Sequence, residues 1–140
     1  ASLVELLDVF PTICDLAGVP APANLQGKSL RPLLNDTSDT LHQAAFTEAR
    51  RGVNAEFFGR SVRTPRWRYT EWDEGRRGRE LYDHDTDPRE LTNLAENPAH
   101  AANVADLSRR LREAARAAHP ASGTPPIVQE GLWAPIVAAP

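Results

Sequence analysis

The sequence predicts an α+β fold in which a small antiparallel sheet is covered by a C-terminal helix and preceded by a separate helix. Apolar residues repeat at helical spacing in residues 2–17 and again in residues 98–118, and a period-two alternation occupies residues 61–72. With 140 residues, of which 41% are hydrophobic and 25% charged, the chain fits one ordinary globular domain or a piece of a larger one.

The first helix is expected to end at Ala17, because Gly18 followed closely by a proline is typical of a helix C-terminus. Pro11 would interrupt a helix that began earlier, so we place the start near Asp8, which would cap the helix. Residues 3–7 then form a short strand or a loop. The helix carries an apolar stripe that we expect to lack its usual sheet partner in this chain: Leu6, Phe10, Ile13 and Leu16.

Residues 19–57 are rich in proline and glycine and are expected to be mostly loop, with one helical turn at 29–34 and a strand at 44–48. The alternation that follows predicts an antiparallel hairpin whose turn lies at Pro65 and Arg66. A short strand is expected at 80–82. Asp87 followed by a proline and, two positions later, a glutamate predicts one turn of helix over 87–90.

The last helix is expected to start at Asn97, a capping residue followed by a proline, and to run to about Ala118. One stripe of this helix is apolar and should cover the sheet. Its members are Val104, Leu107, Leu111, Ala114 and Ala118. Residues 120–140 contain repeated prolines and small residues, which predicts an extended or disordered tail.

Charge and hydropathy argue against two classes of partner, nucleic acid and membrane. Sixteen basic against nineteen acidic residues give a net charge of −3, which argues against nucleic acid as the main partner. Apolar runs are far shorter than the roughly 20 residues that cross a bilayer, and no signal-peptide pattern opens the chain, so we expect no membrane partner. Residues 60–79 are nevertheless rich in arginine and carry a local excess of positive charge.

Candidate nucleophiles and metal ligands are few. Cys14 is the only cysteine, so no internal disulfide is possible. Asp83, His84 and Asp85, with Asp87 nearby, offer ligand types for a divalent cation, but neighbours on an extended chain point in opposite directions, which favours a polar turn. The other histidines are isolated and expected to be solvated: His42, His100 and His119.

Several strings closely resemble the sulfatase family. The N-terminal strings, similar to the closing part of the sulfatase catalytic domain, are VELLDVFPTICDLAG at 4–18, LQGKSL at 25–30 and PLL at 32–34. The later strings resemble the C-terminal subdomain of that family, most of all its iduronate-2-sulfatase-like branch: RSVRT at 60–64, RYTEW at 68–72, ELYD at 80–83, DP at 87–88 and NLA at 93–95. The resemblance covers roughly residues 3–118.

The resemblance implies how the chain is organised. Residues 1–57 would be the closing segment and linker of an alkaline-phosphatase-like α/β catalytic domain, to which the first helix would belong. Residues 58–119 would be the C-terminal sulfatase subdomain, and 120–140 the flexible tail. The implied function is hydrolysis of sulfate esters of sulfated sugars. The implied partners are the remainder of the catalytic domain and the sugar substrate, in a periplasmic or secreted enzyme.

The resemblance also implies that the reacting groups lie elsewhere. Sulfatases of this type use a formylglycine made from the Cys or Ser of a Cys/Ser-x-Pro-x-Arg motif, assisted by a calcium ion. Cys14 is followed by DLAG, which lacks both the proline and the arginine, so we interpret it as a small packed side chain. We therefore expect no catalytic residue, metal ligand or cofactor in this chain and no activity from it alone. Calcium and formylglycine are expected in the part outside it.

The arginine-rich hairpin supplies the candidate substrate-binding residues, Arg63, Arg68 and Trp72, on one wall of the substrate cleft. A guanidinium binds a carboxylate or sulfate through paired hydrogen bonds, which suits an acidic sugar. Alternatively, these arginines form ion pairs with acidic residues where the catalytic domain meets the sheet, or they simply lie exposed to solvent on one face of the sheet. Trp67 and Tyr69 are expected in the core. The rival function is a non-catalytic module that binds an anionic glycan or single-stranded nucleic acid.

Overall fold

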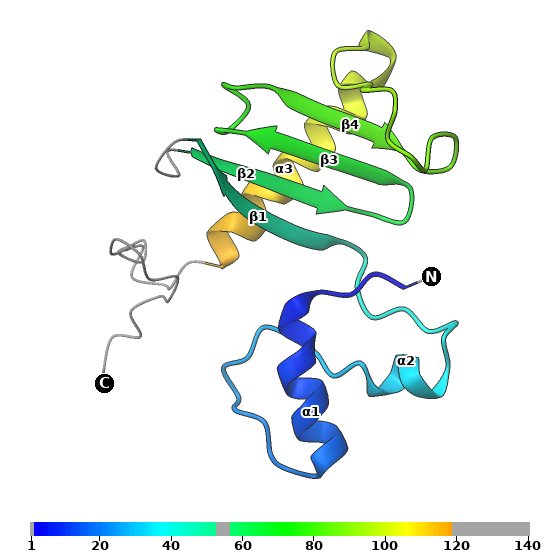
Figure 1. The fold of residues 1–140 in the computed structure, drawn as a ribbon, viewed down its shortest axis with the longest axis vertical. Helices are drawn as coiled ribbons and strands as arrows, with labels where there is room; N and C mark the ends of the chain where they lie inside the picture. The colour runs from blue at the N-terminus through cyan, green and yellow to red at the C-terminus, as the bar shows by residue number, and fades with distance from the viewer. Residues whose placement is uncertain (1, 53–56, 119–140) are drawn as a thin grey trace.

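A four-stranded antiparallel sheet forms the body of the protein, in a computed structural model that describes residues 2–52 and 57–118 (Figure 1). The strands follow one another in the order β1-β2-β3-β4. They are β1 (Ala45–Arg51), β2 (Phe57–Arg63), β3 (Trp67–Trp72) and β4 (Arg79–Asp83). The predicted α+β class, the hairpin and the two flanking strands are confirmed. The predicted tail at 120–140 and His119 lie outside the described residues.

Helix α3 (Ala101–Ala117) covers one face of this sheet, as predicted, and follows a single 3-10 turn, η2 (Pro98–His100). The Asn97 side chain accepts a hydrogen bond from the Ala99 N–H at 3.0 Å and so caps the turn. The sheet and α3 bury a common apolar core. Its members are Val62, Tyr69, Leu81, Val104, Leu107 and Leu111.

A buried polar contact also joins α3 to the sheet. The Tyr69 hydroxyl donates to the Glu71 carboxylate at 2.9 Å, and the Ser108 hydroxyl of α3 donates to the same oxygen. Burial, reinforced by the nearby Glu71, raises the pKa of Tyr69 well above its usual value, so the phenol stays protonated and remains a donor. Because all three groups are buried, the contact satisfies polar atoms that would otherwise destabilise the core.

The helical turn predicted over residues 87–90 is wrong. The segment is a turn in which the Glu90 N–H donates to the Asp87 carbonyl oxygen at 3.1 Å, and Glu90 has the left-handed φ of 56°. The Asp87 side chain accepts from the Thr92 N–H at 2.8 Å. Side-chain contacts of Glu90 with Arg68 of β3 and with His84, which follows β4, outweigh the local helix-start signal.

The N-terminal helix is built as a 3-10 turn, η1 (Leu6–Asp8), followed by α1 (Val9–Ala17), and a short α2 (Arg31–Asn35) lies beside it (Figure 1). The predicted start near Asp8 and the end at Ala17 are confirmed, and Gly18 adopts a φ of 66°. The expectation that Asp8 caps the helix is wrong, because its side chain makes no capping hydrogen bond to α1. Instead of a strand, residues 3–7 contribute one isolated bridge between Leu3 and His42 and the turn η1.

Asp8 is a fully buried carboxylate that ties three segments together, a role that sequence reasoning missed. It accepts from the Glu5 N–H at 2.8 Å, the Lys28 N–H at 2.9 Å and the His42 ring at 2.9 Å. The expectation that His42 is solvated is therefore wrong. Burial alone would raise the pKa of Asp8, but these hydrogen bonds to its charged form outweigh burial and lower that pKa.

The apolar stripe of the first helix is exposed, as expected. Leu6 is 89% exposed, and the others are more than half exposed: Phe10, Ile13 and Leu16. The helix lies away from α3 and does not cover the sheet (Figure 1). Contiguous apolar surface of this kind normally marks an interface.

Asp8→Ala should destabilise the N-terminal segment by about 3 kcal/mol at neutral pH, because three donors lose their shared, fully buried acceptor. The folded-state pKa of Asp8 is lowered, so this stability is present above about pH 4 and is lost as the pH falls through the folded-state value. Hydrogen exchange of residues 2–44, measured from pH 7 to pH 2, tests both statements. Asp36→Ala, which removes an exposed carboxylate that accepts hydrogen bonds from Ser38, is the control. Equal loss for both variants would contradict the assignment.

Candidate functional site

The face of the sheet turned away from α3, called the open face below, carries the candidate site. Successive side chains of a strand alternate between the two faces, and the strand register fixes which residues share a face. Val62, Tyr69 and Leu81 point toward α3. The open face is therefore formed by Ala45, Thr47, Ala49, Arg51, Phe57, Gly59, Ser61, Arg63, Arg68, Thr70, Trp72, Glu80 and Tyr82.

Arg63 and Arg68 stand directly opposite each other on β2 and β3. Like charges in this position repel and need an anion or other acceptors nearby. The Arg63 guanidinium donates to the main-chain carbonyl oxygens of Thr64 and Trp67, the second at 3.4 Å. Burial lowers the pKa of Arg63, Glu90 opposes that lowering, and Arg68 adds to it, yet a guanidinium this basic stays charged.

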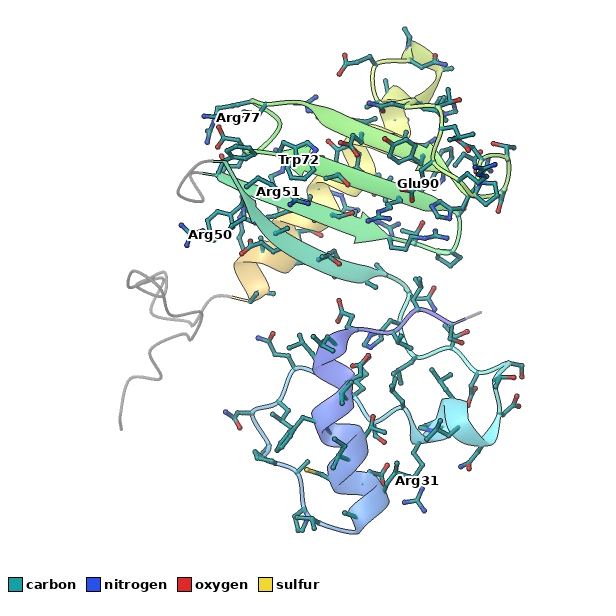
Figure 2. The ribbon with its side chains drawn as sticks, in the orientation of Figure 1. Arg31, Arg50, Arg51, Trp72, Arg77 and Glu90 are labelled. Atoms are coloured by element: carbon teal, nitrogen blue, oxygen red, sulfur yellow. The ribbon has the colours of Figure 1, made fainter. Side chains whose placement is uncertain are left out.

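Glu90 supplies a carboxylate to this end of the open face. It accepts from the Arg68 guanidinium at 3.2 Å and 3.3 Å and lies 2.7 Å from the His84 ring nitrogen (Figure 2). Sequence reasoning missed Glu90 because it lies 22 positions from Arg68, in a segment expected to be helical. No local signal marks it, since only the turn at 87–90 brings it back to the sheet.

Trp72 shares the open face with the two arginines but lies at the other end of it. Its strand partner is Gly59, which is four positions, roughly 13 Å, along β2 from Arg63. The indole lies over Gly59 so closely that an added Cβ would come within 2.3 Å of a ring carbon. The indole N–H donates to Glu80 at 2.8 Å. Arg63 and Arg68 are thus brought together, and Trp72 is not.

The acidic cluster at 83–85 forms a polar turn. Arg66 donates to both oxygens of Asp83, at 2.9 Å and 2.7 Å, and mainly this hydrogen bonding lowers the pKa of Asp83. Within residues 2–52 and 57–118, no group of three or more His, Cys, Asp or Glu could hold a metal ion. Cys14 is buried in α1. Within the same two ranges, no helix is both long and apolar enough to cross a membrane.

Comparison with known proteins gives the family. Residues 1–117 match the model of the N-sulphoglucosamine sulphohydrolase C-terminal domain. The chain belongs to the sulfatase family. It is 39% identical over 101 residues to arylsulfatase K of Rattus norvegicus, covering 67% of this chain and 18% of that protein. It is 40% identical over 106 residues to a Delta 4,5-hexuronate-2-O-sulfatase of Bacteroides thetaiotaomicron, covering 71% of this chain and 21% of that protein.

The solved structure of a 2-O GAG sulfatase is similar in fold as well, with a TM-score of 0.68 and 37% identity, over 79% of this chain and 24% of that one. Sulfatases have an alkaline-phosphatase-like fold, and this chain has the small sheet and helix of their C-terminal part. The matched part of this sulfatase chain spans about a fifth of the length of the curated relatives, 18% and 21%.

Gly59→Ala should displace the Trp72 indole and destabilise the sheet by about 1–3 kcal/mol, because the new methyl group overlaps the ring. Chemical denaturation gives the stability, and near-ultraviolet circular dichroism reports the indole environment. In a Trp72→Ala background the same substitution should cost little, since the overlapping ring is gone. A cost that is equal in both backgrounds would show that the glycine is needed for another reason.

Proposed function

We propose that this chain is the C-terminal part of a sulfatase that hydrolyses sulfate esters of sulfated sugars, and that its open face forms one wall of the substrate cleft. The observation that carries the proposal is the pair of guanidiniums, Arg63 and Arg68, held opposite each other with Glu90 bonded to Arg68. Arg63 forms no ion pair with the described residues. Its charge is available for an acidic group of the substrate.

The names of the relatives support this class of substrate. One relative acts on a hexuronate 2-O-sulfate, and one structural neighbour is described as a 2-O GAG sulfatase. A uronic acid carries a carboxylate beside its sulfate ester. A planar guanidinium recognises that carboxylate by two parallel hydrogen bonds, whereas an uncharged substrate offers no such contact. Trp72 would contribute an aromatic surface to the same wall.

The reacting groups of the enzyme belong to the part of the sulfatase outside this chain in our proposal. Cys14 does not fit the formylglycine role, because it lies buried in α1 and lacks the required proline and arginine after it. The described acidic residues offer no cluster for calcium. Residues 1–57 complete the catalytic domain, and 58–119 supply the wall. We expect the rest of the catalytic domain to pack against the exposed apolar stripe of α1.

The isolated chain should not hydrolyse a chromogenic aryl sulfate above background, with or without added calcium, because it holds no formylglycine to attack sulfur. Release of the chromophore from purified chain, beside the full-length enzyme as a positive control, tests this. Turnover that Cys14→Ala abolishes would overturn the assignment of Cys14. Turnover that survives this substitution would reveal another catalytic site.

In the full-length enzyme, Arg63→Ala should lower kcat/KM for a sulfated uronic acid about tenfold or more, and for a neutral aryl sulfate much less. The difference arises because only the sugar acid offers a carboxylate to the guanidinium. Arg63→Lys should restore part of the loss, since an ammonium keeps the charge but not the paired geometry. Steady-state kinetics on both substrates provide the measurement.

Arg112→Ala is the matched control, because Arg112 is an exposed arginine of α3, on the opposite side of the sheet. Melting temperatures of all variants separate binding from folding. If Arg63→Ala lowers the melting temperature sharply and reduces both activities in proportion to the folded fraction, Arg63 is a structural residue that holds the carbonyls of the turn.

A further inference from the structure

The end of the open face farthest from Arg63 holds a second group of cationic and aromatic side chains, called the distal patch: Arg51, Phe57, Trp72 and Arg77. Arg51 and Phe57 are strand partners on β1 and β2. The Phe57 and Trp72 rings meet edge to face with their centroids 6.4 Å apart. The Arg77 guanidinium lies 4.5 Å from the centroid of the Phe57 ring.

The distal patch carries positive charge that its neighbours only partly balance. Arg51 is exposed and forms no ion pair with the residues that the structure describes. Arg77 is 53% exposed and lies 3.5 Å from Asp73, a carboxylate that Arg76 also binds at 2.7 Å. Figure 2 shows Arg51, Trp72 and Arg77 at one end of the sheet and Glu90 at the other. The open face therefore has a cationic site at each end.

The two ends are too far apart for one sugar ring. Phe57 and Arg63 are six positions apart on β2, which is roughly 20 Å of extended strand. Between them the open face of β1 and β2 carries short side chains: Thr47, Ala49, Gly59 and Ser61. A ligand that contacts both ends must be a chain that carries negative charge at intervals. An acidic polysaccharide has this form, and its rings also present apolar faces to aromatic side chains.

We infer that the distal patch binds a second acidic sugar of the same glycan chain whose first acidic sugar contacts Arg63 and Arg68. This inference rests on the proposed function and assigns Trp72 to the distal patch. Arg51 and Arg77 bind a sulfate or carboxylate of the more remote sugar, and the indole of Trp72 stacks on its ring. The enzyme consequently favours longer oligosaccharides over disaccharides.

The test compares the full-length enzyme on size-defined, sulfated glycosaminoglycan di- and octasaccharides. The wild-type enzyme should bind and turn over the octasaccharide more efficiently than the disaccharide. The double variant Arg51→Ala/Arg77→Ala should lower the ratio of octasaccharide to disaccharide kcat/KM about tenfold, because each exposed charge contact contributes modestly. Calorimetric titration with the octasaccharide should show a comparable increase in Kd.

The double variant Arg112→Ala/Arg116→Ala removes equal charge from α3, on the other side of the sheet, and should leave the ratio unchanged. An unchanged ratio in Arg51→Ala/Arg77→Ala would overturn the inference and indicate that the rest of the enzyme covers the distal patch. An equal loss in both double variants would also overturn it, as an effect of overall charge. Failure of the proposed function is seen separately, when Arg63→Ala leaves disaccharide turnover intact.

Discussion

The packing of α3 against Val62, Tyr69 and Leu81 determines how the whole sheet is oriented. These neighbours form one cross-strand row, and a shift of one residue in any strand would turn its apolar side chains away from the helix. The carboxylate of Glu71, bonded to Tyr69 and to Ser108 of α3, adds a polar constraint inside the same core. With this face covered, the alternate residues have only the open face left to occupy.

The arrangement of charge on the open face follows from that constraint. Arg63 neighbours the buried Val62 in sequence, so it must point away from the core, and the register then sets it opposite Arg68. Two cations held opposite each other on a rigid sheet repel each other and destabilise it unless anions lie nearby. Glu90 provides one such anion from within the chain. In the function that we propose, an acidic group of the substrate provides another, and the packing of the core then positions the residues that bind it.

The N-terminal segment is stabilised by polar contacts instead of an apolar core. Its order depends on the buried Asp8, whose partners come from residues 5, 28 and 42, while α1 leaves its apolar stripe exposed. A segment held by polar contacts and presenting apolar surface is typical of part of a larger core. The aligned part of this chain spans only 18% and 21% of the matched relatives, which agrees with that interpretation.

The sequence by itself determined the strands, α3, the bounds of α1 and the sulfatase resemblance, because alternation, capping residues and family strings are local patterns. The alternation in residues 61–72 also implies that Arg63 lies on the face opposite Val62. Only the tertiary structure decided that Asp8 meets His42, 34 positions away in sequence, and that Arg68 meets Glu90, 22 positions away. It also separated Trp72 from the arginines. Register and long-range polar contacts decide these features, and both depend on how distant segments meet, which no local pattern encodes.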